Sequence, residues 1–235
     1  MLLGLAAGAL TAARVGVRRQ VVVAALRAAV QLAVVGLVLG AAFRFPVATA
    51  AVLTVMLATA TRTAGRRIRD LAGATRAVLV AMVAGAVPTL AVAFGTGAVE
   101  WSPRYVVALG GIVLGGAMTA CTLAGRQLLA GLRTRREEVE GYLALGATPR
   151  QAVAPVARTA VVESLLPAID QTRTVGLVTL PGAFVGALFG GASPAVAARF
   201  QLVVLVGLLA AEALAACTLT YVLGAPTRLP APPSE

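Results

Sequence analysis

The sequence predicts an all-α fold, a polytopic transmembrane helical bundle. Of its 235 residues, 59% are hydrophobic and only 12% are charged, whereas soluble domains are about 45–50% apolar and about 25% charged. Several apolar runs approach or reach the ~20 residues that a helix needs to cross a ~30 Å hydrocarbon core. The sequence lacks the short alternating segments typical of a transmembrane β-barrel. We therefore expect helices to cross the membrane.

Seven apolar runs are candidates for these crossings. They are Leu2–Ala13, Val21–Phe43, Pro46–Ala60, Ala77–Phe94, Tyr105–Ala124, Thr159–Leu180 and Leu202–Leu223. The first would rise only ~18 Å as a helix, so we expect it to be thinned and tilted or to start upstream. We expect about seven spans, or six if this run does not cross. A signal peptide is the alternative for this run, but its positive charges should precede the apolar core. Here three arginines follow it, which favours an uncleaved first helix with the N-terminus outside.

The basic residues predict the orientation of the chain. All 20 are arginines, and loops rich in arginine alternate with loops that hold one. The rich segments contain Arg14, Arg18 and Arg19, then Arg62, Arg66, Arg67, Arg69 and Arg76, then Arg126, Arg133, Arg135, Arg136, Arg150 and Arg158. By the positive-inside rule, residues 125–154 and the C-terminus are cytoplasmic. The net charge of +11 then reflects topology, so we expect membrane lipid and no nucleic acid as a partner.

The chain is expected to form a single transmembrane domain over residues 1–225, followed by a disordered tail at 226–235 that is Pro-rich and polar. Residues 159–200 are too long for one crossing, since a continuous helix would reach ~60 Å. Pro181-Gly182 and Ser193-Pro194 interrupt this stretch. Non-helical backbone at membrane depth is tolerated only where protein shields it or where it lines a wet cavity. The break at Pro181 and Gly182 is therefore a candidate gate, followed by a short helix that dips back or lies at the outer surface.

Residues 125–154 form a hydrophilic segment that we expect to be two short helices around a tight elbow. Gly146 can end the first helix in the left-handed conformation. Thr148 and Pro149 are typical of an N-cap and a first helical residue. Leu143 and Leu145 would then be available to dock against another protein. An ordinary solvated loop is the alternative.

Charged side chains within the spans are the second candidate site, because each costs on the order of 3 kcal/mol at the bilayer centre. Arg27 lies one turn before Gln31 and shares its face. Glu163, Asp170 and Arg173 lie in the sixth run, and Arg173 is three residues after Asp170, so the two can pair. Glu212 is alone in the last run. A translocation path is one interpretation, and a structural ion pair with charges that reach the interface is the other.

The composition also argues against several function classes. The chain has no Lys, so it lacks the lysine of a Walker A phosphate loop and is not a standard P-loop ATPase. It has two cysteines, no CxxC motif and no His, which makes a structural zinc site improbable. No nucleophile and base pattern is visible, so we do not expect an enzyme.

Two sets of motifs carry a resemblance to a known family. Residues 140–152 read Glu140-x-x-Leu-x-Leu-Gly-Ala-Thr-Pro-x-Gln-Ala, which resembles the coupling segment of ABC-transporter permeases. The remaining motifs resemble the FetB (YbbM) family of such permeases, the bacterial iron-export permeases related to the plant aluminium-tolerance permease. These motifs are Arg27-Ala-Ala-Val-Gln31-Leu, Thr61-Arg-Thr-Ala-Gly-Arg66, Pro167-Ala-Ile-Asp170, Thr174-Val-Gly-Leu-Val-Thr-Leu-Pro-Gly182, Gly190-Gly-Ala-Ser-Pro194 and Arg199-Phe-Gln201. One departure is Gly115-Gly116-Ala-Met118, where the family has Gly-Asn-x-Met.

The resemblance implies a homodimeric permease of the cell (inner) membrane. ATP and Mg would bind to a separate ATP-binding subunit, and this chain would need no cofactor of its own. It implies export of a metal ion such as iron, or of a related solute. The residues expected to couple to the ATPase are Glu140, Leu143, Leu145, Gly146, Ala147, Thr148 and Pro149. Those expected on the translocation path or gate are Arg27, Gln31, Asp170, Arg173, Pro181 and Gly182. The alternatives are an ATP-independent channel or secondary transporter and, less favoured, a membrane anchor that recruits a partner.

Overall fold

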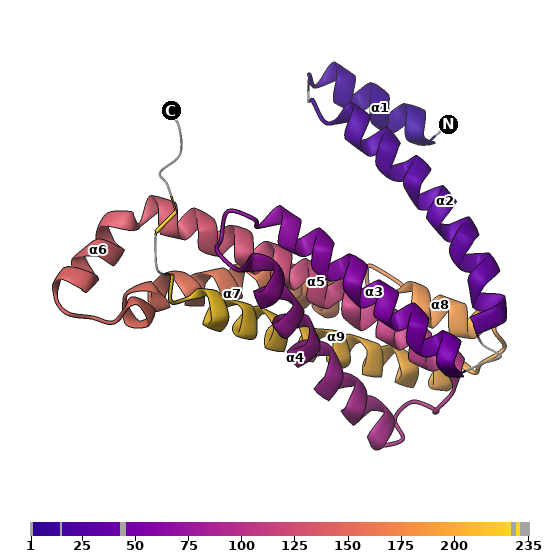
Figure 1. Ribbon diagram of the computed structural model, residues 1–235. Helices are drawn as coiled ribbons and strands as arrows, with labels where there is room; N and C mark the ends of the chain where they lie inside the picture. The colour runs from indigo at the N-terminus through magenta and orange to yellow at the C-terminus, as the bar shows by residue number, and fades with distance from the viewer. Residues whose placement is uncertain (1, 15, 43–45, 227–228, 231–235) are drawn as a thin grey trace. The chain divides into compact units, whose positions relative to one another are not determined.

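The described residues form nine α-helices and no β-strand, which confirms the predicted all-α fold (Figure 1). The structure is a computed structural model and describes residues 2–14, 16–42, 46–226 and 229–230. In chain order the helices are α1 (Leu2–Ala12), α2 (Arg18–Ala42), α3 (Pro46–Arg67), α4 (Ala74–Gly95), α5 (Pro103–Thr134), α6 (Arg136–Ala144), α7 (Pro149–Thr174), α8 (Gly182–Phe189) and α9 (Pro194–Leu223).

Six of these helices are long and apolar enough to cross a membrane, namely α2, α3, α4, α5, α7 and α9. Each contains or overlaps one of the apolar runs found in the sequence. The first run forms α1, which has 11 residues and rises only ~16 Å. By length, the helices therefore match the six-span alternative of the prediction.

The chain divides into two compact units, Met1–Ala50 and Ala51–Glu235. In the first unit, α1 packs against α2, and the chain reverses between them near Arg14, whose φ is 54°. The second unit holds α4 to α9 and most of α3. In that unit, α6 and α8 lie at opposite ends (Figure 1).

The core of the second unit is built largely from small side chains of α4, α5 and α9. Fully buried alanines include Ala81, Ala117, Ala120, Ala211 and Ala215. A Cβ atom added at Gly85 would lie 2.5 Å from the carbonyl oxygen of Ala211, so α4 and α9 are in backbone contact. Small residues of this kind let helices approach closely, which drives helix packing in membranes.

The hydrophilic segment at 125–154 differs from the prediction of two short helices. Its first ten residues continue α5, which runs for 32 residues to Thr134. The helix persists because Leu128 and Leu132, four residues apart, are both fully buried and hold one face against the core. Only α6 is a short helix, since α7 runs for 26 residues. The predicted elbow between α6 and α7 is present.

The predicted break in the sixth apolar run is also present, but it begins earlier than expected. Helix α7 ends at Thr174, and residues 175–181 are non-helical up to the start of α8 at Gly182. The Thr174 carbonyl accepts a hydrogen bond from the backbone N–H of Val178 at 2.9 Å. Gly176 takes a φ of 83°, a conformation that glycine adopts without strain. This turn ends the helix before Pro181.

Candidate functional site

The elbow between α6 and α7 begins with a complete Schellman C-cap. Gly146 has a φ of 89° and follows the last residues of α6. The backbone N–H of Ala147 donates to the carbonyl of Tyr142, and that of Gly146 donates to the carbonyl of Leu143, both at 3.0 Å. These are the two bonds that define the motif. The predicted left-handed Gly146 is therefore confirmed, and Ala147 is part of the cap.

The second half of the elbow is a capping box at the start of α7. The Thr148 hydroxyl accepts from the backbone N–H of Gln151, and the Gln151 side chain accepts from the backbone N–H of Thr148 at 2.9 Å. Pro149 is the first residue of the helix, where its missing N–H costs nothing. The predicted roles of Thr148 as the N-cap and of Pro149 as the first helical residue are confirmed. Two caps joined back to back fix the direction of the chain with few free torsions.

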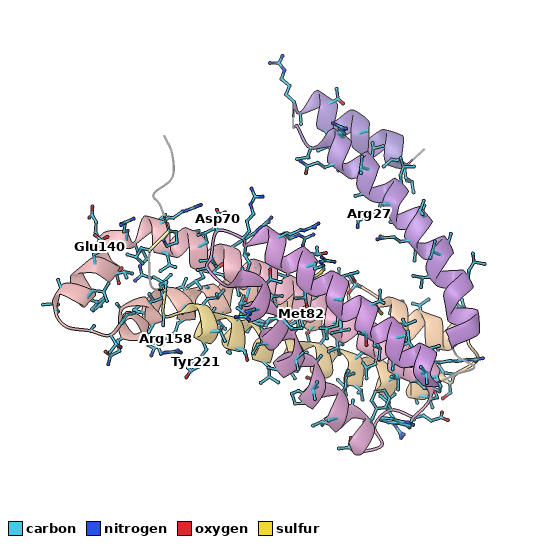
Figure 2. All side chains as sticks on the ribbon, viewed as in Figure 1. Arg27, Asp70, Met82, Glu140, Arg158 and Tyr221 are labelled. Atoms are coloured by element: carbon cyan, nitrogen blue, oxygen red, sulfur yellow. The ribbon has the colours of Figure 1, made fainter. Side chains whose placement is uncertain are left out.

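The elbow presents apolar and charged side chains to its surroundings. Leu143 is 38% exposed and Leu145 is 86% exposed. The carboxylate of Glu140 pairs with Arg136 one turn earlier, at 2.8 Å. On the same helix, Val139 is fully buried and anchors α6 in the core. Figure 2 shows Glu140 on α6, at the end of the second unit.

The start of α7 is tied to the end of α9 through Arg150. Its guanidinium lies 3.8 Å from the centre of the Tyr221 ring and donates to the Tyr221 carbonyl at 2.9 Å. A cation over an aromatic ring is attracted by the ring quadrupole. The elbow therefore connects directly to two long helices of the bundle, α7 and α9.

The charged residues predicted for the spans lie in different parts of the structure. Arg27 and Gln31 lie one turn apart on α2, in the first unit. Asp170 and Arg173 lie on the last turns of α7 in the second unit, where their side chains form an exposed ion pair at 3.6 Å. The pair at 170 and 173 is the one that the spacing predicted. An exposed pair of this kind contributes little to stability.

Pro181 and Gly182 lie at the N-terminus of α8, as the predicted break requires. Pro181 lines a cavity of about 380 Å³ between residues 175–184 and α9. The buried side chain of Gln201 on α9 accepts a hydrogen bond from the backbone N–H of Phe184 at 3.1 Å. Gln201 therefore holds the first turn of α8 against α9. Gln201 belongs to one of the motifs that carry the family resemblance, but the sequence did not predict this contact.

A second feature that was not predicted surrounds Glu212, which the sequence showed only as a lone charge in the last run. Glu212 is 7% exposed and lines a cavity of about 310 Å³ together with residues of α5 and α7. A Cβ atom added at Gly116 would lie 2.7 Å from Glu212 Oε1. Its neighbours come from helices far apart in the sequence, and no local spacing indicates them.

Comparison with known proteins gives one consistent family. The model of the uncharacterised protein family UPF0014 matches residues 1–226. The UPF0014 membrane protein STAR2 of rice is 37% identical over 210 residues, which cover 88% of this chain and 74% of the relative. The UPF0014 membrane protein YjkA of Bacillus subtilis is 32% identical over 216 residues, covering 91% and 86% of the two chains.

A third relative carries a functional name. The probable iron export permease protein FetB of Escherichia coli is 36% identical over 200 residues, which cover 83% of this chain and 77% of the relative. No solved structure matches the chain. Three findings agree with each other. The family model matches nearly the whole chain, six helices are long and apolar enough to cross a membrane, and each of three relatives aligns with most of the chain. The chain is a multi-pass membrane protein that belongs to the uncharacterised protein family UPF0014.

Proposed function

We propose that this chain is the permease subunit of an ABC transporter, driven by a separate ATP-binding subunit. The observation that carries the proposal is the elbow, a rigid double cap that presents Leu143 and Leu145 at the end of the bundle. The chain has no Lys for a Walker A loop, so ATP and Mg would bind to the partner. In this proposal the chain is a transport subunit and not an enzyme.

Helix α7 offers the mechanical link between the elbow and the membrane. It is continuous for 26 residues from Pro149 to Thr174, a rise of ~39 Å. Its far end carries Asp170 and Arg173 and leads into the break before Gly182. Closure of the ATPase dimer would press on the elbow, and α7 would carry this displacement to the break. ATP would thereby shift the permease between inward-open and outward-open states.

The proposed cargo is iron or a related solute, and the proposed direction is export. This rests on the E. coli relative, which is named a probable iron export permease. We also propose that two copies of the chain form the transporter in the cell (inner) membrane, as the resemblance to ABC permeases implies. Cross-linking of the purified chain in membranes tests the dimer directly.

The coupling role is tested by Leu145→Asp, because Leu145 is exposed and its replacement leaves both caps intact. Burial of a leucine against the partner contributes about 1.5–3 kcal/mol, so the variant is expected to lower affinity for the ATP-binding subunit at least tenfold. The measurement is co-purification with a candidate ATP-binding-cassette subunit expressed together with the chain, and the ATP hydrolysis of that subunit in proteoliposomes. Leu145→Met is the control, since it keeps an apolar side chain of similar volume.

Two results would contradict the proposal. If Leu145→Asp binds the ATPase and stimulates hydrolysis like the unchanged chain, the elbow is not the docking element. If the chain alone moves iron across proteoliposomes without any ATPase, the channel or secondary transporter is favoured instead. In that case intramembrane charges would act as an ion or proton relay.

A further inference from the structure

The cavity beside Glu212 lies in a groove formed by three helices of the second unit. Its volume is about 310 Å³, enough for about ten water molecules at ~30 Å³ each. Helices α5, α7 and α9 all contribute to its wall. The polar side chains among the lining residues are Thr119, Ser164, Gln171 and Glu212.

Glu212 is a carboxylate at the inner wall of this cavity. It is 7% exposed, and none of the salt bridges or hydrogen bonds among the described residues involves its side chain. No side-chain oxygen in the described structure is both fully buried and without a hydrogen-bond partner. Within that part of the chain the carboxylate oxygens of Glu212 have no partner, so they are accessible from the cavity that Glu212 lines. An ionised carboxylate in such a place is costly unless a positive charge accompanies it.

The neighbouring side chains are arranged as acceptors. The Ser164 hydroxyl donates its proton to the carbonyl of Val161 at 2.8 Å, and the Thr119 hydroxyl donates to the carbonyl of Gly115 at 3.0 Å. With their protons used within the helices, both oxygens keep lone pairs that can face a ligand. The Gln171 amide adds a carbonyl oxygen. The cavity therefore offers one anionic and three neutral oxygen atoms.

We propose that this cavity binds the transported ion, a hard metal cation held by Glu212 with Gln171, Ser164 and Thr119. Oxygen ligands of this kind suit hard cations. Within the described residues no three His, Cys, Asp or Glu side chains come together, and one carboxylate with neutral oxygens makes a weak site. A transported ion must be able to leave, and the space lets it keep several waters. The inference rests on the proposed function, because it assigns a site to the proposed cargo.

The site would respond to movement of α7. Ser164 and Gln171 lie on α7, which begins at the elbow, whereas Glu212 lies on α9 and Thr119 on α5. A displacement of α7 along α5 and α9 would separate the Ser164 and Gln171 oxygens from the carboxylate. The cation would then lose ligands in one of the two transport states. This gives the elbow a route to control affinity.

The test is binding of Mn²⁺, a hard-cation probe, to the purified full chain in detergent without any ATPase. Bound Mn²⁺ loses its sharp EPR signal, so free and bound ion can be counted. We expect one site per chain, and Glu212→Gln should raise the dissociation constant at least tenfold with little change in shape. Thermal unfolding of the variant checks that it remains folded.

The matched control is Glu163→Gln, which removes a carboxylate from α7 at an exposed position outside the cavity lining. It should bind Mn²⁺ like the unchanged chain. The inference is overturned if the unchanged chain binds no Mn²⁺, if Glu212→Gln binds as tightly, or if Glu163→Gln causes the same loss. Because no ATPase is present, these results are distinguishable from a failure of coupling at Leu145.

Discussion

At the scale of single residues, the carboxylate of Glu212 packs against Gly116, where a side chain would collide with it. A Cβ atom at position 116 would meet both Glu212 Oε1, at 2.7 Å, and the end of the Leu208 side chain. Any side chain there would displace the carboxylate from its place against α5. The motif that this chain resembles has Asn at this position. The absence of a side chain at Gly116 leaves the room that the Glu212 carboxylate occupies, a contact that the sequence alone did not reveal.

Arg135 and Glu138 form an ion pair with two hydrogen bonds at the junction of α5 and α6. The guanidinium donates two hydrogen bonds to the carboxylate, at 2.7 and 2.6 Å. These bonds favour the ionised acid and hold the pKa of Glu138 below its ordinary value. Because the folded-state pKa is lowered, the contact stabilises fully above the ordinary Glu pKa of ~4.3. That stabilisation is lost as the pH falls through the lowered pKa.

Replacement of the arginine tests this assignment. In Arg135→Gln the carboxylate loses its charged donor, so the pKa of Glu138 should rise toward the ordinary value. Carbon-13 NMR of the Glu138 carboxyl group, titrated from pH 6 to pH 2.5, measures both midpoints. Equal midpoints in the two proteins would contradict the proposed contact. Global stability should change little, since both side chains are partly exposed.

At the scale of elements, the elbow is the part of the site that local sequence predicted well. Its signals lie within a few residues of each other: Gly146 needs a positive φ, and Thr148, Pro149 and Gln151 complete a cap. The end of α5 was predicted less well, since hydropathy falls at Ala124 while the buried spacing of Leu128 and Leu132 continues. Mean hydropathy detects membrane burial, whereas burial against other helices follows the 3.6-residue period.

Thr148 is expected to control the order of the first turn of α7. Thr148→Ala removes the side-chain acceptor for the Gln151 N–H, and the loss of such a cap costs about 1 kcal/mol. Amide hydrogen exchange at residues 150–152 should then quicken roughly fivefold. Thr159→Ala is the control, because that hydroxyl only donates to the Pro155 carbonyl within the same helix. Equal exchange in both variants would show that the cap does not hold the elbow.

At the scale of the whole molecule, the sequence predicted which segments cross the membrane but not which side chains meet between them. Apolar length identifies a span from one segment alone. The cavity at Glu212 requires positions 119, 164, 171 and 212 to converge from three helices, and that convergence depends on packing. The Asp170–Arg173 pair was predictable because both residues lie on one helix, three positions apart.

The number of crossings decides on which side of the membrane the two termini lie. Six crossings place both termini on one side, whereas a seventh by α1 would place them on opposite sides. The sequence favours an N-terminus outside, which requires seven crossings, whereas the six helices of spanning length alone would give a cytoplasmic N-terminus. We therefore predict that position 2 lies outside if α1 crosses, and in the cytoplasm on the side of α6 if only the six long helices do.

Single-cysteine labelling tests this topology. In a chain with Cys121→Ala and Cys217→Ser, which removes both native thiols, one cysteine is introduced by Leu2→Cys, Glu100→Cys or Gly141→Cys. A membrane-impermeant maleimide applied to right-side-out vesicles should label the variant at position 100, between α4 and α5, and spare the one at 141 in α6. Position 2 decides between six and seven crossings, and it should be spared only if the six long helices alone cross. If it is labelled like position 100, α1 crosses, and the bilayer must thin around an 11-residue helix or α1 must lengthen.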